Sequence, residues 1–172
     1  YSELLKGKSD QVPPSVAQKA RCVAVFSNVF TAAAVLGGSR GNGVASCRTE
    51  DGSWSYPLFV DISSASLGAQ FGVKFSDIVL FLLTEKAERA LKKGKITLGA
   101  DANVTVGSFD DSWDSGGSSI VAYERSEGGM MGVSLNGFTL TRNVVMNRNF
   151  YGWEADERVV LDISSSNSSR SG

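Results

Sequence analysis

Residues 43–60, GVASCRTEDGSWSYPLFV, decide the expected fold of this chain. An apolar run begins at Val44, a polar turn follows at Glu50-Asp51-Gly52, and a second run extends from Trp54 to Val60. Aspartate next to glycine is a frequent turn pair between two antiparallel strands. We therefore predict a β-hairpin with strands at residues 44–49 and 54–60.

The segment before this hairpin predicts a short helix and a buried strand. Pro13-Pro14 and Ser15 are typical of a helix start, and we expect the helix to continue to about Lys19. The run of apolar residues from Cys22 to Phe30 favours a strand. Four glycines lie among small residues at positions 37–43, which favours bends and close backbone approach in a strongly curved sheet.

The segment after the hairpin predicts a strand followed by a well-delimited helix. Residues 64–72 are small and contain glycine, and Ile78–Leu83 forms a continuous apolar run of strand length. Thr84 is the expected N-cap of a helix whose first turn contains acidic residues, and Gly94 is expected to end this helix after Lys92-Lys93.

The C-terminal half indicates further strands. Residues 95–107 partly alternate between apolar and polar, and we predict one strand there. Strands are also expected at 120–125, 132–135 and 138–142, with Asn136-Gly137 as a hairpin turn. The predicted fold class is therefore α+β and β-dominated: a single domain with a curved antiparallel sheet or barrel-like core and two or three short helices.

Length and composition limit the domain organisation and the partners. The 172 residues, 42% of them hydrophobic, suit one core, and we expect an extension at 1–11, a domain at 12–163 and a disordered polar tail at 164–172. The formal net charge is −1, so nucleic acid is not an expected partner. The chain opens on Tyr1, which suggests a processed or trimmed form.

The two cysteines, Cys22 and Cys47, admit two readings. They could pair in an oxidising compartment, but two cysteines fall far below the density of a disulfide scaffold. The favoured expectation is a pair of buried free thiols. Neither cysteine belongs to a CxxC pair, so no structural zinc is expected.

Several segments, in this order, resemble the SYLF (Ysc84-type) family. They are VPPSVAQKARCVAVF, DGSWSYPLF, SLGAQFGVKFSDIVLFL, KITLGADANVTVG, IVAYERSEGGMMGVSLNG and NRNFYG, which together cover about residues 12–152. The matching residues are mostly architectural, because glycines permit bulges, tight turns and close packing. The structural motif residues are Trp54, Pro57, Gly68, Gly72, Gly99, Gly132, Tyr151 and Gly152.

The resemblance implies a binding function. Members of the family bind phosphoinositides or anionic phospholipids, and the yeast-type branch binds and bundles actin. The resemblance implies a periplasmic or lipid-anchored lipoprotein if the chain is bacterial, and a cytoplasmic, peripheral membrane protein if it is eukaryotic. We expect a non-enzymatic module that associates with a phospholipid membrane, with actin binding or another protein interaction as the alternative.

The expected headgroup site is a cluster of cations at residues 86–95: Lys86, Arg89, Lys92, Lys93 and Lys95. At helical spacing Lys86, Arg89 and Lys93 share a face, and each contact with phosphate is worth about 1 kcal/mol. A solvated helix face whose last cations satisfy the helix dipole is the alternative.

The aromatic residues also admit two readings. An acyl-chain pocket would be concave and mainly apolar, whereas a filled core would leave no void. The side chains concerned are Phe26, Phe30, Trp54, Phe59, Phe71, Phe75 and Phe81, and core packing is favoured for each.

Metal, cofactor and catalytic sites are not expected. Asp110, Ser112, Asp114 and Gly116 imitate the start of a calcium loop, but Val121 stands where the bidentate carboxylate belongs. The chain has no histidine, which removes the commonest general base. Asp61, Asp77 and Asp101 leave glycosidase-like pairs formally open, and nothing in the sequence selects a pair.

Overall fold

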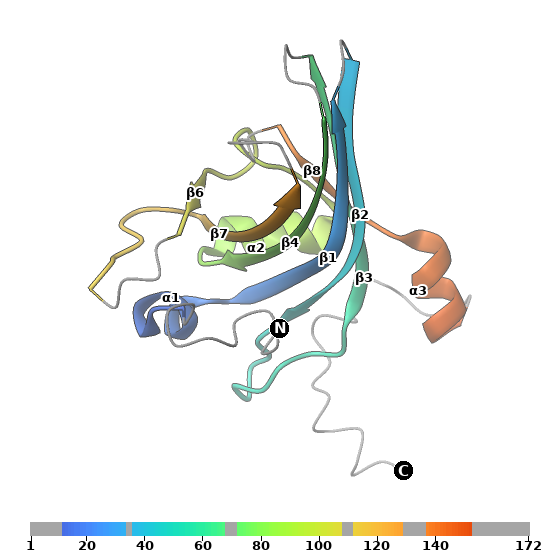
Figure 1. Cartoon of the computed structure of the whole chain (residues 1–172). Helices are drawn as coiled ribbons and strands as arrows, with labels where there is room; N and C mark the ends of the chain where they lie inside the picture. The colour runs from blue at the N-terminus through green and yellow to red at the C-terminus, as the bar shows by residue number, and fades with distance from the viewer. Residues whose placement is uncertain (1–11, 34–35, 68–71, 108–111, 129–136, 153–172) are drawn as a thin grey trace.

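A strongly curved sheet of eight strands forms the body of the protein (Figure 1). The computed structural model describes residues 12–33, 36–67, 72–107, 112–128 and 137–152. The elements, in chain order, are α1 Pro14–Lys19, β1 Cys22–Ala33, β2 Leu36–Cys47, β3 Leu58–Leu67, β4 Gly72–Leu82, α2 Glu85–Lys93, β5 Lys95–Thr97, β6 Val104–Val106, β7 Ile120–Gly128, β8 Thr139–Arg142 and α3 Val144–Tyr151.

The strand order is β5-β8-β3-β2-β1-β4-β7-β6. Neighbouring strands are antiparallel except β6 and β7, which are parallel. The predicted β-dominated α+β class with a curved sheet is therefore confirmed.

The central strand β4 carries buried side chains on both faces. In β4, Ile78, Leu80 and Leu82 belong to one core cluster, and Val79 and Phe81 to the other. Successive side chains of a strand point to opposite faces, so a strand covered on both sides is apolar throughout. This burial explains the unbroken apolar run that predicted the strand.

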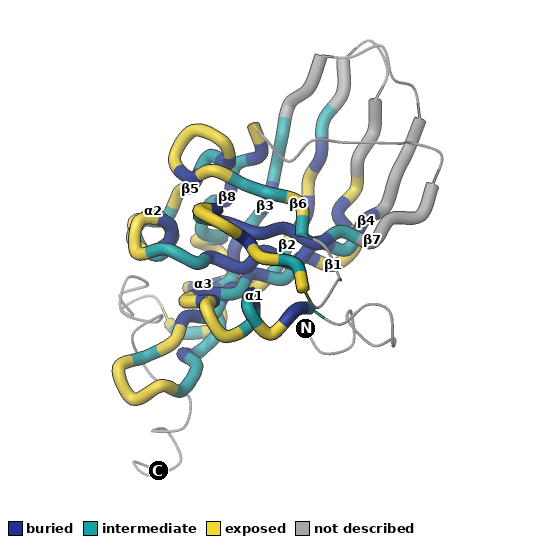
Figure 2. Tube along the Cα trace, turned by 90° about the vertical axis from the view of Figure 1, so that its left-hand side faces the viewer, coloured by how far each residue is buried: buried dark blue, intermediate teal, exposed yellow. Residues whose placement is uncertain are grey.

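The helices cover opposite faces of the sheet. α2 lies within the curve and contributes Ala87 and Leu91 to the larger cluster, whereas α1 contributes Val16 and Ala20 to the smaller one on the outer face (Figure 1). Buried residues follow the middle of the strands, and exposed residues gather on the outer sides of the helices (Figure 2).

The predicted hairpin at residues 44–60 is confirmed, with longer strands than expected. β2 and β3 pair from Ala45↔Leu58 to Leu36↔Leu67 without a register shift, and Arg48 and Trp54 form a bridge beyond them. The glycines at 37–43 lie inside this regular ladder, whereas on the other side of β2 the pairing with β1 has an irregularity between Phe26↔Gly43 and Phe30↔Arg40. The expected close approach is confirmed, because a Cβ on Gly43 would lie 2.1 Å from the Val25 carbonyl oxygen.

The prediction of one strand at residues 95–107 is wrong. A turn at Gly99, whose φ is +91°, ends β5, and β6 lies at the opposite edge of the sheet. The Asp101 carboxylate closes this turn by accepting a hydrogen bond from the Thr97 N–H at 2.7 Å. Gly99 therefore serves a left-handed turn position and not a bulge within a strand.

The expectation of free thiols is also wrong, because Cys22 and Cys47 form a disulfide. The two residues are directly paired across β1 and β2, and both are buried. Sheet register brings them together, and spacing along the chain does not reveal it.

The remaining sequence predictions divide between confirmed elements and undescribed residues. The short helix after Pro13, the helix capped by Thr84 and the strand at 138–142 are confirmed as α1, α2 and β8. Several predicted features lie outside the described residues. They are the extension at 1–11, Gly68, Phe71, the strand at 132–135 with Gly132, Asn136, and the tail at 164–172.

Candidate binding surfaces

The exposed cations of α2 form the first candidate surface. The Thr84 hydroxyl accepts a hydrogen bond from the Ala87 N–H at 3.3 Å, and Gly94 ends the helix in the left-handed conformation. Lys86, Arg89 and Lys93 are exposed on one face, as the helical spacing predicts. The structure thus brings these three predicted site residues together.

The other two predicted cations differ from this group. Lys92 is half-buried, and its Nζ lies 3.2 Å from a Glu88 carboxylate oxygen. Lys95 is exposed, but it is the first residue of β5 and lies beyond the end of the helix. Arg21 also lies 3.2 Å from Glu88, so this carboxylate is shared by two cations.

The outer surface of α3 was not predicted from the sequence. Its N-cap is Asn143, whose side chain accepts a hydrogen bond from the Met146 N–H at 2.9 Å. Four of its apolar side chains are exposed, and Val145 and Phe150 are 66% and 63% exposed. The other two are Val144 and Met146. Exposed apolar clusters on a small protein mark interaction sites.

A buried asparagine fixes α3 against β3. Asn147 accepts a hydrogen bond from the Phe59 N–H and donates one to the Phe59 carbonyl oxygen, both at 2.8 Å. The Phe150 ring meets the Phe59 ring edge-on at 5.4 Å, and the Tyr151 hydroxyl donates to the Pro57 carbonyl oxygen. Burial, followed by the neighbouring Tyr56, raises the pKa of Tyr151.

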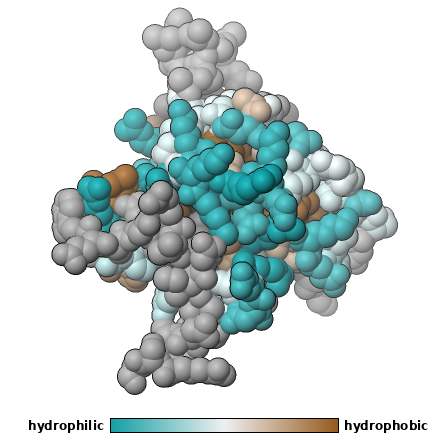
Figure 3. All heavy atoms as spheres, turned by 180° about the vertical axis from the view of Figure 1, so that it is seen from behind, coloured by the Kyte–Doolittle hydropathy of each residue, from teal (hydrophilic) through white to brown (hydrophobic). Residues whose placement is uncertain are grey.

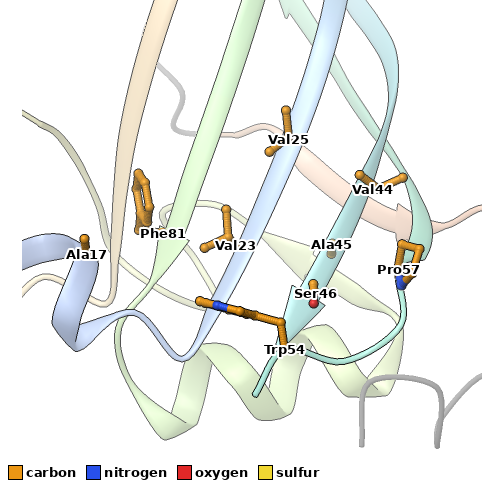
Figure 4. Close-up of a pocket in the computed structure, with 9 residues that line it drawn as sticks. All are labelled: Ala17, Val23, Val25, Val44, Ala45, Ser46, Trp54, Pro57 and Phe81. Carbon is orange, nitrogen blue, oxygen red and sulfur yellow. The ribbon is translucent and has the colours of Figure 1, made fainter. Parts of the chain in front are cut away.

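An apolar groove opens on the outer face of the sheet beside α1 (Figure 4). Its volume is about 320 Å³, and its walls include two of the aromatic residues that the sequence offered for an acyl-chain pocket, Trp54 and Phe81. Phe26 is instead fully buried in the core, and Phe30 is 42% exposed. The complete lining is Ala17, Val23, Val25, Val44, Ala45, Ser46, Trp54, Pro57 and Phe81.

A polar hollow of about 560 Å³ lies further along the sheet. Arg40 of β2, Ser63 of β3 and Thr139 of β8 line it and occupy paired positions on three adjacent strands. The view from behind shows a face covered mainly by hydrophilic residues (Figure 3).

The three acidic residues considered for a carboxylate pair are each held by a separate hydrogen bond. Asp61 accepts a hydrogen bond from the Asn143 side chain, Asp77 from the Asn28 N–H, and Asp101 from the Thr97 N–H. Each therefore has its own structural partner on a different element. Among the described residues, no group of three or more histidine, cysteine, aspartate or glutamate side chains is placed to hold a metal ion.

The calcium-like segment is held by local contacts. The Asp114 carboxylate accepts a hydrogen bond from the Gly116 N–H at 3.2 Å and lies 3.5 Å from the Lys19 Nζ. These two neighbours lower the pKa of Asp114, with the Gly116 N–H as the larger cause. Asp110 lies outside the described residues.

The helices of the described ranges are too short to cross a membrane, and none is a candidate span.

Comparison with known proteins identifies relatives along nearly the whole chain. Protein YSC84 of Saccharomyces cerevisiae is 32% identical over 163 residues, which is 90% of this chain and 35% of that protein. LAS seventeen-binding protein 3 of the same species is 29% identical over 163 residues, with the same coverage. SH3 domain-containing YSC84-like protein 1 of Xenopus laevis is 33% identical over 152 residues, 85% of this chain and 45% of that protein.

The chain therefore spans about a third to less than half of these relatives. No solved structure gives a significant match. The sequence profile of the Ysc84 family, described as "Las17-binding protein actin regulator", matches residues 63–170. A match over more than half of the chain, together with these relatives, shows that the chain belongs to the Ysc84 family.

Proposed function

We propose that this chain is a non-enzymatic protein-interaction module of the actin-regulatory kind, and that actin filaments are its partner. The observation that carries this proposal is family membership, since the family description contains the words "actin regulator" and one relative is named a LAS seventeen-binding protein. The proposal places the function in the region shared with these relatives, which makes up 90% of this chain and 35% of protein YSC84.

The chemistry of the chain supports binding without catalysis. A chain without histidine lacks the usual proton-transfer residue. The three acids considered for a carboxylate pair accept hydrogen bonds from the Asn143 amide, the Asn28 N–H and the Thr97 N–H. Most glycosidases need two such carboxyl groups flanking the bond that is cleaved.

We assign the protein contact to the exposed apolar surface of α3. Phe150 offers a large ring on a helix that Asn147 fixes to the sheet, and aromatic residues on rigid supports supply much of the binding energy at protein interfaces. Val145 is nearly as exposed and lies on the same short helix.

Co-sedimentation with actin filaments tests this assignment. The double variant Val145→Asp, Phe150→Ser is expected to bind filaments about tenfold or more weakly, because truncation of interface anchors commonly costs more than about 1 kcal/mol. Val106→Asp is the matched control, since Val106 is 70% exposed on β6 at the edge of the sheet. Equal binding by the wild type and the double variant would exclude α3 as the contact.

The filament-binding experiment must also control the redox state of the Cys22–Cys47 disulfide. Disulfides persist in oxidising compartments and are rare in the cytosol, where actin filaments lie. Filament binding is therefore measured with the Cys22–Cys47 bond intact and after its reduction. An exported chain would meet phospholipid and not actin, so absence of filament binding in both redox states would reject the actin proposal.

A second candidate function is association with anionic membranes, favoured by the cations of α2. Lys86, Arg89 and Lys93 share one exposed face, and no ion pair is recorded for them within the described residues. Basic side chains near an anionic surface contribute about 1 kcal/mol each. The orientation of these three toward solvent suits such a surface.

Vesicle binding separates this candidate from a general charge effect. The triple substitution of Lys86, Arg89 and Lys93 by glutamate is expected to abolish low-salt sedimentation with phosphatidylserine vesicles while leaving the melting temperature unchanged. The control is a second triple variant, Lys19→Glu, Arg40→Glu, Arg148→Glu, which has the same net charge but carries its substitutions on other surfaces. Equal loss in both triple variants would remove the role of α2.

A further inference from the structure

The groove beside α1 has an apolar floor, and a cation outside its lining contacts two of the residues that form its walls. Val23 of β1 is paired with Ser46 of β2, and Val25 with Val44, so four lining residues form two neighbouring rows on the outer face. Ala17 of α1 and Phe81 of β4 border one side (Figure 4). Trp54 and Pro57 of the hairpin border the other.

Arg48 supplies the cation. Side chains along a strand alternate between faces, so Arg48 follows Val44 and Ser46 on the face that carries the groove. Its Nε donates to the Ala20 carbonyl oxygen at 2.9 Å and its Nη2 to the Ala17 carbonyl oxygen at 3.4 Å. The guanidinium carbon lies 4.6 Å from the centre of the Trp54 ring.

These contacts hold the guanidinium in place without using all its donors. A guanidinium has five N–H donors, and the two bonds to α1 carbonyl groups engage two of them. Arg48 is exposed, so the others face solvent next to two lining residues, Ala17 and Trp54. An anionic group bound there would neutralise the cation beside the apolar groove.

The size of the groove selects a narrow occupant. A helix with its side chains is about 10–12 Å wide, and a stable protein interface covers about 800 Å² on each partner. A groove of about 320 Å³ is instead at the small end of ligand sites, which span about 300–1,000 Å³. A hydrocarbon chain is narrow and has no hydrogen bonds to satisfy, so the apolar walls suit it.

We infer that this groove binds a monomeric single-chain amphipath with an anionic head, of the fatty-acid type. The chain lies along Val23, Val25 and Val44, and the carboxylate reaches the Arg48 guanidinium. This ligand site is separate from the α3 surface assigned to a protein partner and from the α2 cations assigned to a membrane. Its test therefore succeeds or fails independently of theirs.

A series of ligands tests the apolar half of this inference on the wild-type protein. Octanoate and decanoate are titrated below their micelle concentrations, and binding is followed by the ¹H–¹⁵N resonances of Val25, Val44 and the Trp54 indole. Each methylene buried in the groove is expected to raise the affinity about fourfold. Equal affinity for the two chain lengths, or shifts confined to other residues, would overturn the inference.

The anionic half is tested by comparing octanoate with 1-octanol. Arg48→Gln is expected to weaken octanoate binding about tenfold or more and to leave 1-octanol binding unchanged, because a charge-assisted hydrogen bond is lost. If octanoate and 1-octanol bind the wild type equally, and Arg48→Gln changes neither, the assigned role of Arg48 is wrong.

Substitution of a lining residue locates the site. Val44 is 37% exposed, so Val44→Glu keeps its charge hydrated and the fold intact while placing a carboxylate in the groove. We expect it to abolish decanoate binding, whereas Val106→Glu, the same change on the exposed edge strand, retains it. Binding to vesicles but not to free decanoate would overturn the inference in favour of a membrane as the ligand. Binding to neither would overturn it in favour of an apolar side chain of a protein partner.

Discussion

The Asp51 carboxylate organises the turn between β2 and Trp54. It accepts hydrogen bonds from the Ser53 hydroxyl at 2.6 Å, from the Thr49 hydroxyl, and from the Ser53 N–H at 3.1 Å. These donors, the Ser53 hydroxyl first and the Thr49 hydroxyl second, lower the pKa of Asp51 from 3.8 to about 2. The turn is thus held by a charge that is fully exposed to water.

We expect this turn to have an acid limit. Because the folded-state pKa is lowered, the contribution of Asp51 to stability is present above about pH 4 and is lost as the pH falls through about 2. Titration of the carboxyl carbon by NMR measures this pKa directly. Ser53→Ala should raise it toward 3.8, and an unchanged pKa in that variant would contradict the assigned cause.

Gly99 stands at a backbone position that few other residues adopt. Its φ is +91°, and its N–H donates to the Ala102 carbonyl oxygen at 2.8 Å. We expect Gly99→Val to lower the free energy of unfolding by about 1–3 kcal/mol, because a β-branched residue at positive φ is strained. Urea denaturation measures the loss.

Gly117→Val is the control for this substitution. A Cβ at Gly117 meets nothing within 4 Å, and its φ is not positive. The control should keep the wild-type midpoint. If both variants lose the same stability, the left-handed position is not the cause.

At the scale of the element, α3 is attached to the sheet where β8 ends. Val60 still pairs with Arg142 of β8, and beyond that pair the Asn147 side chain donates to and accepts from the Phe59 backbone. The Asn143 N–H also donates to the Phe59 carbonyl oxygen at 2.9 Å, so this N–H and the Asn147 side chain together take the place of a partner strand. The exposed face that we assign to protein binding depends on this attachment.

Asn147→Leu keeps the side-chain volume and removes both hydrogen bonds. We expect the free energy of unfolding to fall by about 1–3 kcal/mol, because the buried Phe59 N–H is left without a partner, whereas the Phe59 carbonyl oxygen keeps its hydrogen bond from the Asn143 N–H at 2.9 Å. Hydrogen exchange at the Phe59 amide should also become faster. Asn149→Leu is the matched control on the exposed side of α3, and equal losses in the two variants would contradict this role.

At the scale of the whole molecule, a single sheet serves two core clusters, and one disulfide joins two of its central strands. The bond links Cys22 to Cys47 across a sequence separation of 25 residues. Because β1 and β2 are already hydrogen-bonded neighbours, the bond acts mainly by restricting the unfolded chain. Reduction should therefore lower stability and preserve the fold.

We expect the reduced wild type to lose about 3.5 kcal/mol of unfolding free energy relative to the oxidised form, as loop closure of this length predicts. Urea denaturation with and without dithiothreitol measures the difference, and thiol alkylation followed by mass spectrometry confirms each redox state. A Cys22→Ala, Cys47→Ala variant should not respond to dithiothreitol. Identical stability of the oxidised and reduced wild type would contradict a role of the bond in the unfolded chain.

The sequence by itself determined the elements whose cause is local. Thr84 and Gly94 delimit α2, because a cap and a left-handed stop act within one turn of the helix. The turn at Asp51-Gly52 indicated the hairpin, and apolar runs covered on both faces indicated the central strands. These features, with the order of the family segments, were sufficient for the fold class and the family.

Only the tertiary structure decided the features that depend on register or on contacts between distant segments. Cys22 faces Cys47 through strand pairing, and Asn147 reaches Phe59 across 88 positions of the chain. The turn at Gly99 divides one alternating segment into β5 and β6, which stand at opposite ends of the strand order, and an alternating pattern does not reveal this division. The groove is a void between α1, the sheet and the hairpin, and a sequence records the side chains that line a void but not the space between them.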